Sequence, residues 1–314
     1  ILSGLVGSEM CIRDSLKGST STVSDASNNA TSATINTLAT TTASTVSTTT
    51  LAGTKIASLA LSGDHALTLT STLAKLQTVT ISGSGGVSTD LSGDGASTTL
   101  GYVTSVDASG STASASTSNG TIANDITIHT STAYTGGAGV DKVTVGASTK
   151  AITLGAGNDT LTLTAALGTG ATADGGDGSD TLVLSNTIIT GISSSATIND
   201  KISNFEKLDF GAWTSAGTTF DLGYLAKVNG YVKIGAVAAG GTDVINNIAN
   251  GGTVEFYGDN SATGITLGIK DATYGSADSA TIALTASTSG VRAGGVVTMN
   301  GVETVNIQTS MTAS

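Results

Sequence analysis

The sequence lacks proline altogether, has a single cysteine, and contains few aromatic and few charged residues, 4% and 11% respectively. With only Cys11 present, no internal disulfide forms, and the cysteine content does not identify a redox compartment. No apolar run approaches the roughly 18 residues of a membrane helix, so we expect no membrane span. This composition does not suit an ordinary globular core. It suits a repetitive β structure that buries small residues in thin layers.

Most of the charged residues that are present are acidic. The chain has 12 Lys and Arg against 23 Asp and Glu, which gives a formal net charge of −11. Because no basic patch exists, the sequence argues against a nucleic-acid partner. An acidic balance of this size favours the binding of cations instead.

Short segments with apolar residues at alternate positions recur along the chain. Early examples are Leu59–Leu61, Leu67–Leu69 and Val79–Ile81, which Gly-rich turns separate. Alternation with a period of two is typical of half-buried strands, and helical periodicity is weak throughout. The sequence therefore predicts an all-β fold. Further strands are expected at Glu255–Tyr257, Ile265–Leu267 and Thr281–Leu284.

A Gly-rich nonapeptide recurs between Gly136 and Val183. It reads GGAGVDKVT from Gly136, LGAGNDTLT from Leu154 and GGDGSDTLV from Gly175. The first two copies are 18 residues apart, and Val145–Thr153 falls in phase between them. The spacer Leu163–Asp174 is three residues longer than one nonapeptide. This pattern is that of a calcium-binding β-helix repeat.

The residue types in the repeat explain why it suits calcium. Gly-Gly pairs allow sharp turns that expose carbonyl oxygens, and the Asp at position six adds a carboxylate. Calcium takes six to eight such oxygens. Two nonapeptides make one coil, so Asp141, Asp159 and Asp180 should stack about 4.8 Å apart on one edge. We expect an ion between neighbouring turns, with Asp159 facing two ions; a Gly/Asp-rich loop without metal is the alternative.

The same register makes predictions for the strands and for the opposite edge. Lys150 stands where the Asp would be on that edge, so no metal is expected there. Each nonapeptide ends in a very short strand with one inward apolar residue. These inward residues are predicted to be Val143, Ile152, Leu161 and Leu182.

A second nine-residue segment occurs three times. Ile202–Phe210 reads ISNFEKLDF, Met299–Ile307 reads MNGVETVNI, and Leu73–Ile81 reads LAKLQTVTI. All three have apolar residues at positions one, four, seven and nine. We interpret them as a turn that tucks an apolar side chain inward, followed by a strand. Chance similarity is the alternative.

Composition divides the chain into five parts. Residues 1–15 contain VGSEMCIRDS, which resembles translated sequencing-adapter sequence, so we exclude them from fold reasoning. Residues 16–50 are low in complexity and predict a Ser/Thr-rich linker, a glycosylated stalk or a poorly ordered piece of a domain. Residues 51–135 predict a β-solenoid and 136–183 the calcium-binding roll. Residues 184–314 are β-rich and predict either more solenoid or a small β-sandwich cap. Their acidic residues Asp243, Asp259, Asp271 and Asp278 are solvated carboxylates or further cation ligands.

These features together resemble RTX-type surface-layer proteins of Gram-negative bacteria, which carry the hemolysin-type calcium-binding repeat. The resemblance rests on the nonapeptides, the Thr/Ser/Ala/Gly-rich strands, the absence of proline and the segments NFEKLDF and NGVETVNI. It implies a right-handed parallel β-solenoid or β-roll with calcium-binding turns. It also implies type I secretion, an extracellular location, assembly into a lattice on the cell and cell-surface polysaccharide as a candidate partner.

In that family the carbonyls of positions one to four join the Asp as calcium ligands. The chain departs from the family where Leu154 replaces the first Gly, where the unit at Val145 is degenerate and where the spacer is longer. These departures affect the expected number of ions. The ligands implied are Gly136, Gly137, Ala138, Gly139 and Asp141; Leu154, Gly155, Ala156, Gly157 and Asp159; and Gly175, Gly176, Asp177, Gly178 and Asp180.

The sequence contains little that suggests catalysis. It has only His65 and His129, and although Asp64 adjoins His65, no G-x-S-x-G elbow or His-rich metal motif accompanies them. We expect a structural protein and no enzyme.

Two alternative functions remain open at this point. One is an RTX fragment of a secreted adhesin or of a type I-secreted enzyme whose active module is missing. The other is an ice-binding β-solenoid. Thr-x-Thr pairs such as Thr68–Thr70 and Thr160–Thr164 favour it, but in the sequence they do not recur at a fixed spacing.

Overall fold

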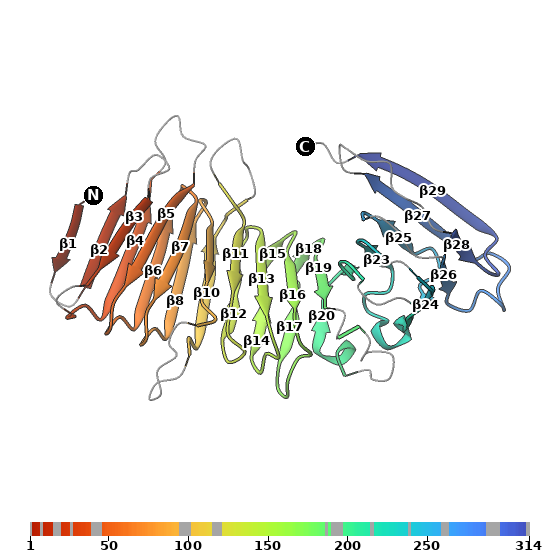
Figure 1. Ribbon diagram of the computed structural model, residues 1–314, viewed down its shortest axis with the longest axis horizontal. Coiled ribbons are helices and arrows are strands. Elements are labelled where there is room, and N and C mark those ends of the chain that lie inside the picture. Colours follow the sequence, from red (N-terminus) through yellow and green to blue (C-terminus); the bar gives the residue numbers. More distant parts are fainter. Residues whose placement is uncertain are drawn as a thin grey trace. The chain divides into compact units, whose positions relative to one another are not determined.

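The protein is mostly β-strand (Figure 1) and divides into two compact units, Ile1–Leu161 with Leu167–Gly178 and Thr162–Ala166 with Ser179–Ser314. Nearly all strand pairs are parallel, which confirms the predicted all-β parallel solenoid class. The computed structural model describes residues 2–6, 9–14, 20–25, 28–38, 46–93, 102–114, 121–185, 188–189, 197–213, 217–237, 240–258, 264–286 and 296–311.

In the first unit, successive strands alternate between two ladders, so each coil gives one strand to each ladder. The pairs are parallel except β1 with β2, which is antiparallel. One ladder runs β1 (Leu2–Val6), β2 (Glu9–Asp14), β4 (Ser32–Thr37), β6 (Ser58–Gly63), β8 (Thr78–Gly83), β10 (Ser105–Ser111), β12 (Ala133–Thr135), β14 (Ala151–Thr153), β17 (Thr172–Asp174). The other runs β3 (Thr20–Ser24), β5 (Ser47–Ala52), β7 (Leu67–Thr72), β9 (Val87–Asp90), β11 (Asn124–Thr127), β13 (Asp141–Val145).

The alternation of apolar and hydroxyl residues produces the thin core of this unit. Strand β8 buries Val79 and Ile81 and exposes Thr78, Thr80 and Ser82, and its neighbours follow the same pattern. The coils differ in length while the strands stay in register. Ser58 pairs with Thr78 only 20 residues later, whereas Ser105 pairs with Ala133 after 28. The connecting loops absorb the difference.

The prediction of a linker at residues 16–50 is wrong for the described part of that segment. Strands β3, β4 and β5 lie there and pair in parallel with the coils that follow. Val23, Ile35 and Leu51 each lie in a strand along which buried and outward residues alternate, with Ser and Thr around them. This hydroxyl-rich sequence therefore has the two-residue periodicity of a β-strand. The excluded segment 1–15 contributes β1 and β2, and β2 pairs with β4.

In the second unit the strands again form parallel ladders, with short 3-10 helices at Asn199–Lys201 (η2) and Leu222–Leu225 (η3). One ladder runs β19 (Thr181–Leu184), β21 (Lys207–Asp209), β23 (Tyr231–Ile234), β25 (Thr253–Phe256), β27 (Ser279–Ala286), β29 (Thr304–Met311). The other runs β22 (Thr219–Asp221), β24 (Thr242–Ile248), β26 (Gly264–Ile269), β28 (Val296–Met299). Strand β20 is Ile202–Ser203, and β16 (Thr160–Leu163) contains the boundary between the units.

The described strands of residues 184–314 form parallel ladders of their own, the arrangement expected of solenoid coils and not of a β-sandwich cap. The strands keep parallel partners because apolar residues continue to point inward, as Val254 of β25 and Ile282 of β27 do. The last described strand, β29, has no such cover, since Ile307 is 71% exposed. Within the described residues, no helix has the length and apolar character needed to cross a membrane.

Candidate functional site: the stacked glycine turns

The three glycine turns, Gly136–Gly139, Leu154–Gly157 and Gly175–Gly178, stack in that order within the first unit. Ala156 N donates to Gly137 O at 2.7 Å, and Asp177 N donates to Gly155 O at 2.8 Å. The second and third turns also form a two-stranded ladder of β15 (Ala156–Gly157) and β18 (Asp177–Gly178). The stacking order predicted from the nonapeptide spacing is confirmed.

The three extra residues of the spacer do not displace the third turn. Strand β17 pairs with β14 in plain register, with Ala173 opposite Ile152. The longer loop lies on the opposite edge, where Gly168 N donates to Ser148 O at 2.7 Å. Lys150 lies on that same edge, directly before β14, and is exposed. Extra length is therefore tolerated on the edge away from the glycine turns.

Glycine is required at positions two and four of the second and third turns. Gly155 and Gly176 have φ of 98° and 94°, and Gly157 and Gly178 follow with 150° and 139°. A Cβ at Gly176 would overlap the carbonyl oxygen of Gly155, because the turns pack backbone against backbone. Position one of the second turn carries no such demand, so Leu154 fits there and buries its side chain, whereas a Cβ at Gly136, position one of the first turn, would overlap the carbonyl oxygen of Leu154.

The aspartates at position six are buried and do not lie on an open edge. Asp141, Asp159 and Asp180 are 0%, 1% and 0% exposed, at or directly before the start of a strand. Burial of a carboxylate requires compensation by hydrogen bonds, a proton or a cation. The residues predicted to point inward are all buried: Val143, Ile152, Leu161 and Leu182.

Asp141 is held by donors from three directions. Its Oδ1 accepts from Asn124 Nδ2 at 2.7 Å and from Tyr134 Oη at 2.9 Å, and its Oδ2 accepts from Gly137 N at 3.2 Å. Its own N–H donates to Oδ1 of Asp159 at 2.8 Å. Burial raises the pKa of Asp141, and the hydrogen bonds from Asn124, Tyr134 and Gly137 oppose that rise. Burial, with the nearby charge of Asp141, also raises the pKa of Tyr134 well above its ordinary value.

Asn124 belongs to this arrangement, and sequence reasoning missed it. It is fully buried and pairs with Asp141 across β11 and β13. Its Oδ1 accepts from Val87 N at 3.1 Å. The Asn124 amide thus occupies, one coil earlier, the position that the Asp141 carboxylate occupies in its own coil. A polar residue opening the alternating stretch NDITI was the signal that could have found it.

The second unit uses the same device with glutamates. Asp180 N donates to Glu206 Oε2 at 2.7 Å, and Asp278 N donates to Glu303 Oε2 at 2.8 Å. In return, the N–H groups of Glu206 and Glu303 donate to the carbonyls of Asp180 and Asp278. The two nine-residue segments that contain these glutamates are therefore structurally equivalent. Each glutamate ties the start of its own strand to the preceding coil.

The third nine-residue segment matches only in its backbone. Gln77 N donates to Ala57 O of the preceding coil, as the glutamates do. Its side chain, however, donates to the carbonyl of Leu76 beside it, and its strand β8 belongs to the other ladder. The shared sequence pattern thus describes a turn into a strand and does not by itself specify the side-chain cap.

The donor set around the glycine turns fits a hard cation in chemistry. It consists of buried carboxylates and main-chain carbonyls, and among the described residues no Lys or Arg pairs with Asp141. The carbonyls of Gly137 and Gly155 already accept one hydrogen bond each and keep a second lone pair. The described residues contain no cluster of three or more His, Cys, Asp and Glu side chains, so a cation would depend on carbonyl ligands.

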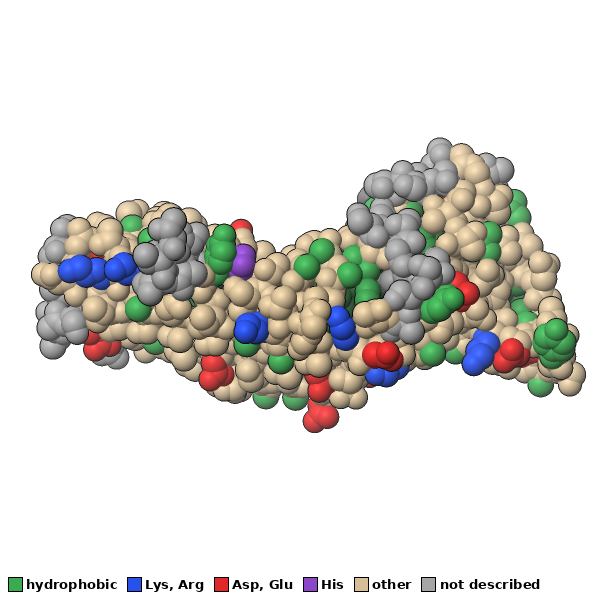
Figure 2. All heavy atoms as spheres, turned by 90° about the horizontal axis from the view of Figure 1, so that it is seen from below, with side chains coloured by type: hydrophobic (Ala, Val, Ile, Leu, Met, Phe, Trp, Pro, Cys, Tyr) green, Lys and Arg blue, Asp and Glu red, His purple; other side chains and the backbone are tan. Residues whose placement is uncertain are grey.

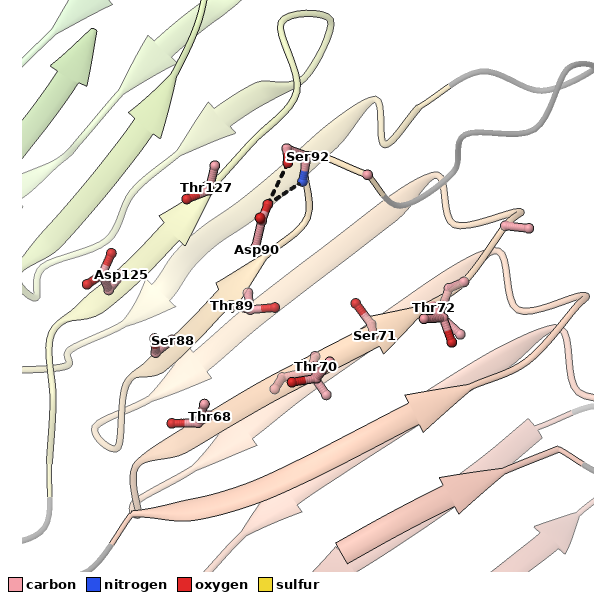
Figure 3. A pocket seen from close by; sticks show the side chains of 14 residues that line it. Thr68, Thr70, Ser71, Thr72, Ser88, Thr89, Asp90, Ser92, Asp125 and Thr127 are labelled. Atoms are coloured by element: carbon pink, nitrogen blue, oxygen red, sulfur yellow. Dashed lines mark hydrogen bonds between the residues drawn. The ribbon is translucent and has the colours of Figure 1, made fainter. Parts of the chain in front are cut away.

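A separate groove of about 830 Å³ lies on the outer face of β7, β9 and β11 (Figure 3). Hydroxyls of Thr68, Thr70 and Ser88 line it together with the carboxylates of Asp90 and Asp125. Despite their uneven spacing in the sequence, the hydroxyl residues align across strands, because each strand pairs in register with the next. The groove combines these hydrogen-bonding groups with apolar ones, Leu69, Leu73 and Ala74.

The histidines are placed apart from any arrangement typical of catalysis. Asp64 is exposed whereas its neighbour His65 is buried. His129 stacks on Tyr102, with ring centroids 3.4 Å apart, and its Nδ1 contacts Ser131 Oγ at 2.8 Å. The absence of an enzymatic role stays a prediction.

No protein-family model matches the chain, and no curated protein matches it significantly. The likeness to RTX-type surface-layer proteins therefore rests on the residues of this chain alone.

Proposed function

We propose that the protein is a calcium-dependent structural component of a bacterial surface layer, secreted and self-assembling. The observation that carries the proposal is the stack of three glycine turns in hydrogen-bonded register, with a buried aspartate two residues after each turn in the sequence. When bound there, Ca²⁺ supplies positive charge to carboxylates that water does not reach. The three turns Gly136–Gly139, Leu154–Gly157 and Gly175–Gly178, with Asp141 and Asp159, are the residues that would hold it.

The charge of the protein supports a role for divalent cations in assembly. At −11, copies of the chain repel one another unless cations screen or bridge them. Figure 2 shows a face that consists mostly of uncharged polar side chains and backbone, on which charged groups are scattered. The hydroxyl-lined groove of Figure 3 is where a polysaccharide of the cell surface would find hydrogen-bonding partners.

The aligned residues of β5, β7, β9 and β11 bear on the ice-binding alternative in both directions. Thr48 and Thr68 align in register, as a flat hydroxyl array would require. The aligned positions on the next two strands, however, are Ser88 and the charged Asp125. Because Asp125 interrupts the row of hydroxyl residues, we retain the structural role as the proposal. The alternative of a fragment from a larger adhesin or enzyme shares the same turns, and a catalytic module in the full-length gene would establish it.

Circular dichroism during a calcium titration of the full chain tests the proposal. Extracellular calcium modules bind at roughly 10⁻⁴ to 10⁻³ M, and at ten times the dissociation constant each site adds about 1.4 kcal/mol. We expect the melting temperature to rise with calcium in the wild type and in the control Lys150→Ala, which lies on the edge opposite the turns. Sedimentation of the same samples should show large assemblies only with calcium. A melting temperature that is the same in excess chelator and in calcium would refute the proposal.

A further inference from the structure

A second polar hollow lies in the second unit, between the turn after β24 and the turn before β27. Its volume is about 310 Å³, and it is lined by Asn250, Lys270, Asp271, Tyr274, Gly275 and Asp278. None of these residues belongs to the nonapeptide repeats. Whatever occupies the hollow is therefore independent of the glycine turns.

Asp278 is the residue that makes this hollow unusual. Its side chain is 4% exposed, and its Oδ1 accepts from Asn250 Nδ2 at 2.6 Å. Among the described residues, its Oδ2 has no hydrogen-bond partner although it is buried. A buried carboxylate oxygen without a donor is costly, by about 1–3 kcal/mol or more for a charged group. Something must compensate it.

The turn at Gly275, which lines the hollow, packs directly against that buried oxygen. A Cβ at Gly275 would overlap Asp278 Oδ2, so only glycine permits the carboxylate to lie against this turn. Asp271 begins the turn in the left-handed region, with φ of 61°, and Tyr274 N donates to its carbonyl at 2.9 Å. An exposed carboxylate and a buried one thus line the same small space.

We propose that this hollow binds a divalent cation of the hard, oxygen-seeking class, with Ca²⁺ as its occupant. Asp278 Oδ2 is the buried charged ligand, and Asp271 is the second carboxylate. Carbonyl oxygens and water complete the six to eight oxygens that calcium takes in irregular geometry, which suits an open site better than the strict octahedron of magnesium. The cation would join the turn before β27 to the coil that begins at Asp278.

The competing occupant is the ammonium group of Lys270, which lines the same hollow. The only ion pair found among the described residues joins Lys233 to Asp209, at 3.6 Å, so Lys270 pairs with neither carboxylate. Lys270 is exposed, and its side chain is free to leave when a cation binds. Replacing it should therefore strengthen binding of the cation.

Isothermal titration calorimetry of the full chain with calcium chloride tests this site. We expect Asp278→Asn and Asp271→Asn each to bind one calcium fewer than the wild type. The control Asp200→Asn changes an exposed aspartate that belongs to neither the glycine turns nor the hollow, and it should bind the same number. Asp278→Asn keeps the shape of the side chain, and its fold is checked by circular dichroism in chelator. If that variant fails to fold, Asp271→Asn decides, because its exposed side chain is not part of the core.

The result also separates this site from the glycine turns. If the turns bind no calcium, the wild type should bind a single ion that Asp278→Asn loses, and this inference survives the failure of the proposed function. Stoichiometry equal to that of the wild type in both aspartate variants would overturn it. So would a Lys270→Ala variant that melts lower in chelator and binds calcium no more tightly, because the ammonium would then be the true partner of Asp278.

Discussion

The backbone N–H of Asp141 donates a hydrogen bond to Oδ1 of Asp159, 2.8 Å away and one coil further along the chain. The position-six aspartate therefore serves the coil before it as well as its own turn. Asn124 has the same relation to the coil before it, because its Oδ1 accepts from the backbone N–H of Val87, and Asp141 in turn accepts from Asn124 through the side-chain Nδ2. Each coil start is tied to its neighbour by a buried polar side chain, and this tie underlies the predictions for the calcium turns.

Asp159→Ala should reduce calcium binding more than Asp141→Ala does. Asp159 belongs to the middle turn, which has a glycine turn on each side, whereas Asp141 belongs to the first turn of the stack. Calorimetric stoichiometry measures the difference, and Lys150→Ala on the opposite edge is the control that should leave binding unchanged. Equal losses for the two aspartate variants, or any loss for Lys150→Ala, would show that the turns do not share ions in this order.

Gly176→Ala should destabilise the first unit strongly. Its left-handed φ costs an alanine about 1–2 kcal/mol, and the added Cβ meets the carbonyl of Gly155 in the preceding turn. Gly93→Ala is the matched control, because its Cβ would meet nothing within 4 Å. Urea unfolding of both variants gives the comparison. A free energy of unfolding for Gly176→Ala within error of that for Gly93→Ala would contradict the backbone-on-backbone packing described for the turns.

Glu206→Ala should cost about 1–3 kcal/mol of stability in the second unit, because the N–H of Asp180 loses its acceptor in a buried place. Glu206→Gln retains an oxygen at the same reach and should recover most of that loss. Thermal melts of the two variants check the pair. If glutamine is as damaging as alanine, the negative charge and not the hydrogen bond is what matters at this position.

Acid should weaken the first unit through His129. Burial lowers the pKa of His129, so the folded protein binds fewer protons than the unfolded chain between that lowered value and the ordinary 6.5. The stability that neutral His129 contributes is present above the ordinary pKa and is lost as the pH falls through the lowered one. Urea unfolding in chelator at several pH values should show a shallower pH dependence for His129→Gln. An unchanged slope would remove His129 as the cause.

The sequence predicted the fold class and the stacking of the turns because both depend on local periodicity. Alternating apolar residues identify strands wherever they occur, and the inward positions at Val143 and Leu161 followed directly from the repeat. The strands around Val23 and Ile35 escaped notice because hydroxyl residues occupy inward positions, Ser21 and Thr37, as well as most outward ones, which lowers the contrast between the two faces. Composition alone suggested a linker where period-two alternation is present.

The site was predicted less completely, because its remaining parts depend on contacts between coils. Nothing in the repeat indicates that Asn124 takes over the place of an aspartate, or that Glu206 caps the N–H of Asp180. The order of residues along one coil does not specify which side chains of the next coil reach it. The same holds for Gly275 and Asp278, whose close approach is a property of the folded turn.

The number of residues per coil varies, and this variation does not change the length of the ladders. One coil advances each ladder by the spacing of adjacent strands, about 4.8 Å, whether it contains the 18 residues from Tyr134 to Ile152 or the 28 from Ser105 to Ala133. Within a unit, the length of a ladder therefore depends on the number of coils and not on the number of residues in them. A peptide inserted beside Gly168 would change the surface of that coil and leave the spacing and register of the strands unchanged.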